Sequence, residues 1–253
     1  MTAAELITAT LAAESCCDPA AFLTEGVHIS ELTADRASNP LVRRFPTPDD
    51  ILTIASTGTG VVVAATPQFI AWATEIFHGM DADDAFSPDI LGAAALHVNA
   101  YSLRLNGPYA YNVVSEQSWV DRSAPSGYAL EIGGAELLQG LNPADWQNAI
   151  APHRAEQGRH DAVAAVALHA DEVVGVAAAS ADADALWQIG VDVHPSHRNR
   201  GIATALTSQA ARAVLDAGKV PYYGTSINNI ASRRAAHSAG FYPCWVSAFT
   251  TAK

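Results

Sequence analysis

The strongest constraint on the fold is an ordered alternation of apolar runs and amphipathic segments in the C-terminal half of the chain. Two apolar runs separated by His169-Ala170-Asp171-Glu172 predict a hairpin of two mostly buried strands. Downstream, helical segments close at Gly218 and Gly240, residues that favour helix ends. The predicted order is strand, strand, strand, helix, strand, helix and final strand, the first six over residues 162–168, 173–179, 186–193, 202–217, 221–227 and 229–239. This order predicts an α/β layer arrangement.

The first half of the chain is less regular. A helix is expected over residues 2–13, followed by a loop-rich passage that contains Pro40, Pro46 and Pro48. Residues 61–65 form an apolar run that predicts a buried strand.

Three pairs of a polar capping residue followed by proline predict helix starts. They are Thr66-Pro67, Ser87-Pro88 and Asn142-Pro143. After the first pair, residues 69–77 carry one apolar stripe with Gly79 as the expected stop. After the second, the apolar face is expected to continue through Leu91, Ala95 and Val98 to Leu105.

A strand is expected over residues 109–114, and the most linker-like stretch of the chain follows between Trp119 and Tyr128. We therefore predict two domains. Residues 1–125 would form a smaller N-terminal α/β domain, and residues 126–253 a C-terminal α/β domain.

Charge limits the partners of the chain. Asp and Glu outnumber Lys and Arg by 26 to 14, a formal net charge of -12, which disfavours nucleic acid and anionic membranes. Residues 1–17 carry neither a basic run nor a long apolar stretch, so we expect a cytoplasmic protein without a signal peptide or membrane span. Three cysteines without a Cys-x-x-Cys pair, and His194 and His197 without a second ligand pair, predict no metal site.

An anionic ligand would need a local positive cluster, and the junction from strand to helix at residues 193–203 provides one. It combines His194, His197, Arg198 and Arg200 with Gly201, where the chain can turn tightly. The first N–H groups of a helix are unpaired and match a diphosphate well. A solvated loop that caps the helix is the alternative interpretation of the same residues.

Two ordered motifs in this region resemble those of the GNAT acyltransferase superfamily. Arg198, Gly201 and Ala203 match its Arg/Gln-x-x-Gly-x-Gly/Ala signature. Asn229-Ile230-Ala231-Ser232, followed by Ala239-Gly240-Phe241, is similar to its second motif. The stretches at 189–195 and 219–223 look like a subgroup in which another domain precedes the catalytic one, and the resemblance covers about residues 130–249.

The resemblance implies a twisted mixed sheet whose central strands splay apart to admit the pantetheine arm of acetyl-CoA. It implies that Val191 and Val193 pair with pantetheine like an added strand. Asn229 and Ser232 would contact the far end of the cofactor, although Asn229 is also a preferred helix cap. The backbone N–H groups of six residues would hold the diphosphate: Arg198, Asn199, Arg200, Gly201, Ile202 and Ala203.

The implied reaction is transfer of an acetyl group to the primary amine of a small molecule. Lysine-like amines have a pKa near ~10, so a proton must be removed, and Asp192 is the candidate base. A structural hydrogen-bond acceptor is the alternative role for Asp192. Ala236 stands where many members of the superfamily have a tyrosine as general acid. This departure keeps open a second function, an acyl-CoA-binding sensor without turnover.

The acceptor and the N-terminal half are less constrained. An acidic chain attracts cationic amines, such as small polyamines, amino sugars or amine-bearing antibiotics. The apolar helix faces of the first half fit a degenerate copy of the same fold, a substrate lid or a homodimer surface.

Overall fold

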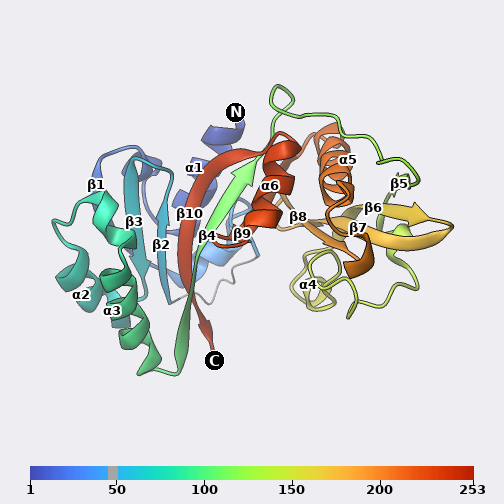
Figure 1. Ribbon diagram of the computed structural model, residues 1–253. Helices are drawn as coiled ribbons and strands as arrows, with labels where there is room; N and C mark the ends of the chain where they lie inside the picture. Colours follow the sequence, from blue (N-terminus) through green and yellow to red (C-terminus); the bar gives the residue numbers. More distant parts are fainter. Residues whose placement is uncertain (45–50) are drawn as a thin grey trace. The chain divides into compact units, whose positions relative to one another are not determined.

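The computed structural model describes residues 1–44 and 51–253, which form two compact units (Figure 1). Unit 1 comprises Met1–Tyr111 and Cys244–Lys253, and unit 2 comprises Asn112–Pro243. This division differs from the predicted boundary after residue 125, because residues 112–125 group with unit 2 and residues 244–253 with unit 1. The position of the boundary between independently folding domains stays a prediction. Pro46 and Pro48 lie outside the described residues.

Unit 1 combines helices with a mixed sheet. Its strand order is β1-β3-β2-β10-β4, with β1 parallel to β3 and with β2 antiparallel to both β3 and β10. The last residues of β4 and the first of β10 belong to unit 2. The elements are α1 (Ala3–Glu14), η1 (Pro19–Phe22), β1 (Gly26–Glu31), η2 (Ala34–Ser38), β2 (Leu52–Ser56), β3 (Gly60–Ala65), α2 (Pro67–Phe77), η3 (Ala82–Phe86), α3 (Pro88–Asn99), β4 (Leu103–Val113) and β10 (Tyr242–Ala252).

Local sequence explains most of these boundaries. Thr2 and Glu5 form a reciprocal capping box that starts α1. Proline occupies the first turn of α2 and of α3, as the two capping pairs predicted. The face predicted to reach Leu105 was wrong, because α3 ends at Asn99 and Leu105 lies on β4.

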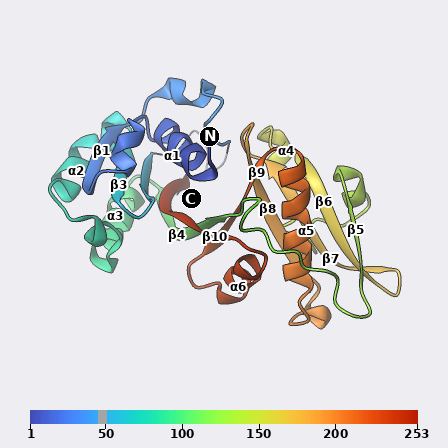
Figure 2. The ribbon, with the colours of Figure 1, turned by 90° about the horizontal axis from the view of Figure 1, so that it is seen from above.

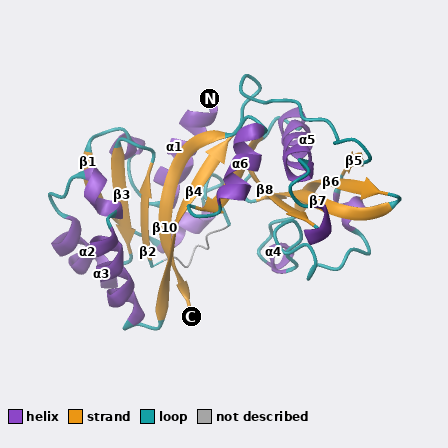
Figure 3. Ribbon diagram, in the orientation of Figure 1, coloured by secondary structure: helices purple, strands orange, loops and turns teal. Residues whose placement is uncertain are grey.

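Unit 2 contains the six elements predicted over residues 162–239 (Figure 3), whereas most of the predicted final strand, β10, belongs to unit 1. Its strand order is β9-β8-β7-β6-β5; β5 to β8 pair antiparallel in succession, and β8 pairs parallel with β9. The elements are β5 (Ala129–Gly133), η4 (Ala135–Leu138), α4 (His153–Glu156), β6 (Asp161–His169), β7 (Glu172–Ala181), β8 (Leu186–Val193), η5 (Pro195–His197), α5 (Ile202–Asp216), β9 (Val220–Ser226) and α6 (Ile230–Ser238).

The predicted helix start at Asn142-Pro143 was wrong. The Asn142 side chain accepts a hydrogen bond from the N–H of Ala144, as in a capped helix, but the segment forms only a turn. Trp146 and Ala149 of this segment are buried against Val166 and Val176 of the sheet. Tertiary packing therefore overrides the local capping signal.

Among the described residues, one hydrophobic cluster of the unit 2 sheet includes helix α5, and another includes the 142–150 segment. Helix α5 packs against β6, β7 and β8 (Figure 2). Gly175 on β7 makes this packing close, since an added Cβ would lie 2.9 Å from a methyl group of Leu206. Along β8, Ile189 packs in the cluster with α5, and Val191 and Val193 lie against it. Side chains alternate along a strand, so Gln188, Gly190 and Asp192 face the other way.

None of the helices within residues 1–44 and 51–253 is long and apolar enough to cross a bilayer.

Candidate active site

A fork between β8 and β9 defines the candidate site. The two parallel strands pair only at Leu186↔Val220, Trp187↔Pro221 and Gln188↔Tyr222. Strand β8 then continues to Val193 and is paired with β7 from Trp187 to Val193. Among the described residues, no pairing with β9 is recorded beyond Gln188. This is the parting of central strands that the sequence resemblance implied.

The turn after β8 leads directly into α5. Asn199 has φ 60° and Gly201 has φ 85°, so both lie in the left-handed region that reverses the chain before the helix. No protein acceptor within residues 1–44 and 51–253 is bonded to the backbone N–H of any residue from 199 to 204. The segment therefore presents a run of donors at the positive end of a 15-residue helix.

The two arginines of this turn are exposed, and both make a contact with the backbone nearby. Arg198 Nε donates to the carbonyl of Val193 at 3.0 Å, which ties the turn to the end of β8. Arg200 Nη2 reaches the carbonyl of Ser196 at 3.5 Å. Both guanidinium groups keep further donors for an anion.

Three histidines and a tyrosine lie beside this turn; His194 and His197 were predicted there, and His169 and Tyr128 were not. His197 Nδ1 is 3.0 Å from the Tyr128 hydroxyl, and the His169 and His197 ring centroids are 5.2 Å apart. Partial desolvation lowers the pKa of His197, and the positive charges of His169, Arg200 and His194 lower it further. The permanent positive charges next to the free N–H groups are therefore those of Arg198 and Arg200.

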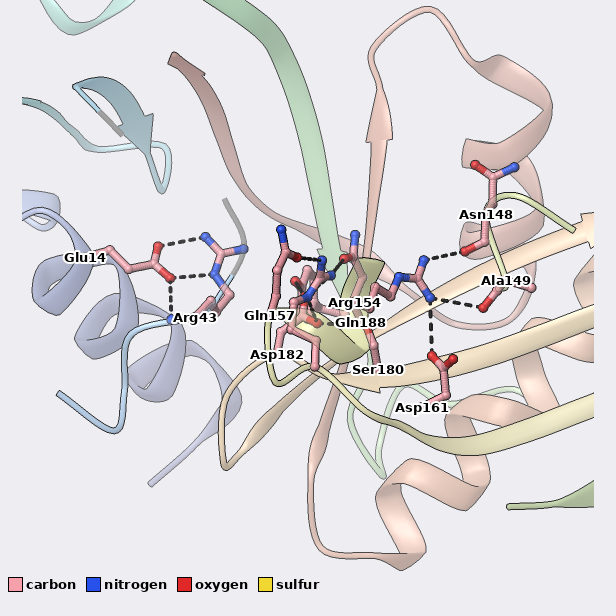
Figure 4. A network of polar contacts seen from close by, with 12 residues as sticks. Glu14, Arg43, Asn148, Ala149, Arg154, Gln157, Asp161, Ser180, Asp182 and Gln188 are labelled. Atoms are coloured by element: carbon pink, nitrogen blue, oxygen red, sulfur yellow. Dashed lines mark hydrogen bonds and ion pairs between the residues drawn. The ribbon is translucent and has the colours of Figure 1, made fainter. Parts of the chain in front are cut away.

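Asp192 is held firmly at the other side of β8. Its carboxylate accepts hydrogen bonds from Asn148 N at 2.7 Å, Asn148 Nδ2 at 2.6 Å and Ala149 N at 2.9 Å. Arg154 in turn donates to the carbonyls of Asn148 and Ala149 (Figure 4). These contacts support the structural alternative for Asp192; its role as a base stays a prediction.

The second predicted motif lies at the start of α6. Asn229 Oδ1 accepts from Ser232 N at 3.1 Å, so Asn229 caps the helix as the alternative interpretation expected. Ser232 Oγ is 2.8 Å from the hydroxyl of Tyr223, a buried residue of β9 just beyond the fork. Ala236 is fully buried in the same hydrophobic cluster as Tyr223. Contact of Asn229 or Ser232 with a cofactor stays a prediction.

In the part of the chain that the structure describes, no group of three or more His, Cys, Asp and Glu side chains is arranged to hold a metal ion.

Comparison with solved structures finds several that resemble this chain at low sequence identity. A GCN5-related N-acetyltransferase-like protein from Streptococcus suis is 17% identical, over 81% of this chain and 84% of that one, with a TM-score of 0.46. A GCN5-related N-acetyltransferase from Kribbella flavida is 16% identical, over 66% and 64%, with a TM-score of 0.47. A tandem GNAT protein from the clavulanic acid biosynthesis pathway is 18% identical, over 79% and 64%, with a TM-score of 0.46.

The match to the Kribbella and tandem proteins thus spans slightly less than two thirds of their lengths. No protein with a curated description matches the sequence. The model of the acetyltransferase (GNAT) family matches residues 135–241, a range that contains the fork, the turn at 194–201 and both predicted motifs. Over residues 135–241, the chain therefore carries a domain of the GNAT acetyltransferase family, whose enzymes use acetyl-CoA.

Proposed function

We propose that this chain transfers the acetyl group of acetyl-CoA to the primary amine of a small molecule. The observation that carries the proposal is the position of two complementary features, one at each end of residues 189–193. The fork begins after Gln188, and the free N–H groups at 199–204 follow Val193. A diphosphate fits the N–H groups, and an extended arm fits the unpaired edge of residues 189–193.

The same geometry supports our proposed roles for the predicted cofactor residues. The backbone N–H groups from Arg198 to Ala203 would bind the diphosphate, although the N–H of Arg198 already donates to the carbonyl of Pro195 at 3.4 Å. The backbone of Val191 and Val193 would pair with the pantetheine arm. Holding the thioester and the amine together in one orientation supplies much of the rate enhancement.

In the transfer step, the amine nitrogen attacks the thioester carbonyl carbon. A C–N bond forms, the C–S bond breaks, and the sulfur leaves as CoA thiolate, which then takes a proton from water. The amine gives up a proton, for which Asp192 is our candidate acceptor through a water molecule. An ionised carboxylate offers about four lone-pair sites. Three are used by Asn148 and Ala149, so one remains for such a water.

The absence of a tyrosine at Ala236 is compatible with turnover. Thiol pKa values lie near ~8.5, so a CoA thiolate is a tolerable leaving group at neutral pH without a dedicated acid. The formal charge of -12 favours cationic acceptors by electrostatic steering.

Titration calorimetry with acetyl-CoA tests the binding site. Arg200→Glu should weaken binding by about tenfold, equivalent to ~1.4 kcal/mol, because it places a negative charge beside the free N–H groups. Arg104→Glu on β4 is the control, since it changes the net charge equally. Equal affinity of the Arg200→Glu variant and the wild type would exclude this site.

Free thiol release in the presence of acetyl-CoA and a panel of polyamines and amino sugars tests the transfer step. Thiol production that requires an amine supports the enzyme. Binding of acetyl-CoA without turnover on any amine would favour the alternative function, an acyl-CoA sensor.

A further inference from the structure

A buried ion pair lies at the base of the fork. Arg159 and Asp182 are 2% and 0% exposed, and they pair through two parallel contacts, Nε–Oδ1 at 2.7 Å and Nη2–Oδ2 at 3.0 Å. Ser180 Oγ donates to the same carboxylate at 2.8 Å, and the Tyr222 hydroxyl also donates to it. Figure 4 shows Asp182, Ser180, Gln157 and Gln188 converging on this network.

The network connects the strands on both sides of the fork. Arg159 precedes β6, Asp182 follows β7, and Arg159 Nη2 donates to Gln188 Oε1 on β8 at 3.0 Å. Tyr222 lies on β9. Gln188 and Tyr222 are also the last residues of β8 and β9 that pair with each other. The side-chain network thus ties the two strands together at the residue pair where they separate.

Energetics indicate that such a network has a positional role. Burying an ion pair often gives no net stabilisation, because desolvation of the two charges offsets their attraction. Here the cost is limited since Asp182 accepts four hydrogen bonds, and these donors come from separate parts of the sheet. Tyr222 reaches Asp182 from β9, and Gln188 accepts from Arg159 on β8, so the whole network is satisfied only when β8 and β9 keep one spacing at this point.

We infer that Tyr222, Gln188, Asp182 and Arg159 are positioning residues that fix where the cofactor cleft opens. They set the separation of β8 and β9 immediately before residues 189–193, where the proposed pantetheine arm would pair. A displacement of about 1 Å at a reacting centre can cost about 10²-fold in rate, so the fork must be held precisely. This inference rests on the proposed function, because it assigns the placement of acetyl-CoA to this network.

Calorimetry on the full chain tests the inference with two matched substitutions. Tyr222→Phe removes the donor to Asp182 that comes from β9, and Ser180→Ala removes a donor to the same carboxylate that comes from β7. Both substitutions should lower the melting temperature of the protein, measured by scanning calorimetry. Only Tyr222→Phe should weaken acetyl-CoA binding, by about tenfold, and it should leave ADP binding unchanged. ADP carries the diphosphate without the pantetheine arm, so it does not sense the fork. Gln188→Ala, which removes the acceptor on β8, should reproduce the Tyr222→Phe effect.

The outcomes separate this inference from the proposed function. If the wild type does not bind acetyl-CoA, the proposed function fails. If the wild type binds it and folded Tyr222→Phe and Gln188→Ala variants bind equally well, the positioning role is wrong and the proposed function stands. Equal weakening by Ser180→Ala, or a parallel loss of ADP binding, would also overturn the inference, since either would indicate a general loss of structure.

Discussion

At the residue scale, Gly190 shows how closely the 142–150 segment approaches β8. A Cβ built at Gly190 would lie 1.9 Å from the carbonyl oxygen of Asn148, a backbone atom that cannot rotate away. Any side chain at this position would push the segment off the strand. The neighbouring Asp192 would then lose the donors that hold its carboxylate.

We therefore expect Gly190→Ala to destabilise the protein by about 3 kcal/mol in urea unfolding, the upper range for overpacking. Gly92→Ala is the matched control, because Gly92 is exposed in α3 and has open space around it. Replacing a helical glycine with alanine should stabilise by about 0.5–1 kcal/mol. Equal stability of the Gly190→Ala variant and the wild type would show that the segment does not pack as described.

Sequence predicted the residues of the turn but not their partners. Gly201 and the charges around it could be read from the chain, because a left-handed residue and a positive cluster leave local signatures. The contact of Asp192 with Asn148 joins residues 44 positions apart, and Arg159 and Asp182 are 23 apart. Nothing local encodes such pairs, since they form only once the strands are assembled. The role of Asp192 was left open for this reason.

At the element scale, strands and helices of unit 2 follow closely from the sequence. Strand β8 was predicted at the observed residues 186–193, and α5 ends one residue before the expected position. These elements are predictable because periodicity and end signals agree. At Asn142-Pro143 a capping pair occurs without a long apolar stripe after it, so the local signal produces a turn. A helix needs both signals.

The start of α5 carries a prediction about pH. The pKa of His197 is lowered in the free protein. The folded chain therefore binds a proton at His197 less readily than the unfolded chain does. A bound diphosphate would raise the His197 pKa again, so binding takes up a proton. Acetyl-CoA affinity should therefore rise as the pH falls from about 7.5 to about 6.

Calorimetry at the two pH values measures this effect. Since a phosphate group of the ligand itself titrates near ~6, the informative quantity is the difference between the wild type and His197→Gln. The variant should lose part of the pH dependence. An identical pH profile for both proteins would place the diphosphate away from His197.

At the scale of the whole molecule, the stretch that looked like a linker is part of unit 2. Trp119 Nε1 donates to the carbonyl of Ser208 on α5 at 2.9 Å, and Val120 N donates to the carbonyl of Ala239 at 3.2 Å. Gly240 lies so close to this stretch that an added Cβ would be 2.1 Å from the carbonyl of Ser118. The polar, proline-containing composition of this stretch is typical both of linkers and of packed segments that form no helix or strand.

These contacts predict the outcome of dividing the chain. A fragment of residues 112–243 should melt at a higher temperature than one of residues 126–243, because only the longer fragment retains Trp119 against α5. Losing a packed tryptophan costs about 3 kcal/mol, which corresponds to about 10 °C for a fragment of this size. Thermal unfolding followed by circular dichroism measures the difference. If the shorter fragment melts at the same temperature or higher, the domain boundary lies after residue 125, as the composition of the chain indicated, and the contacts of residues 112–125 contribute little to folding.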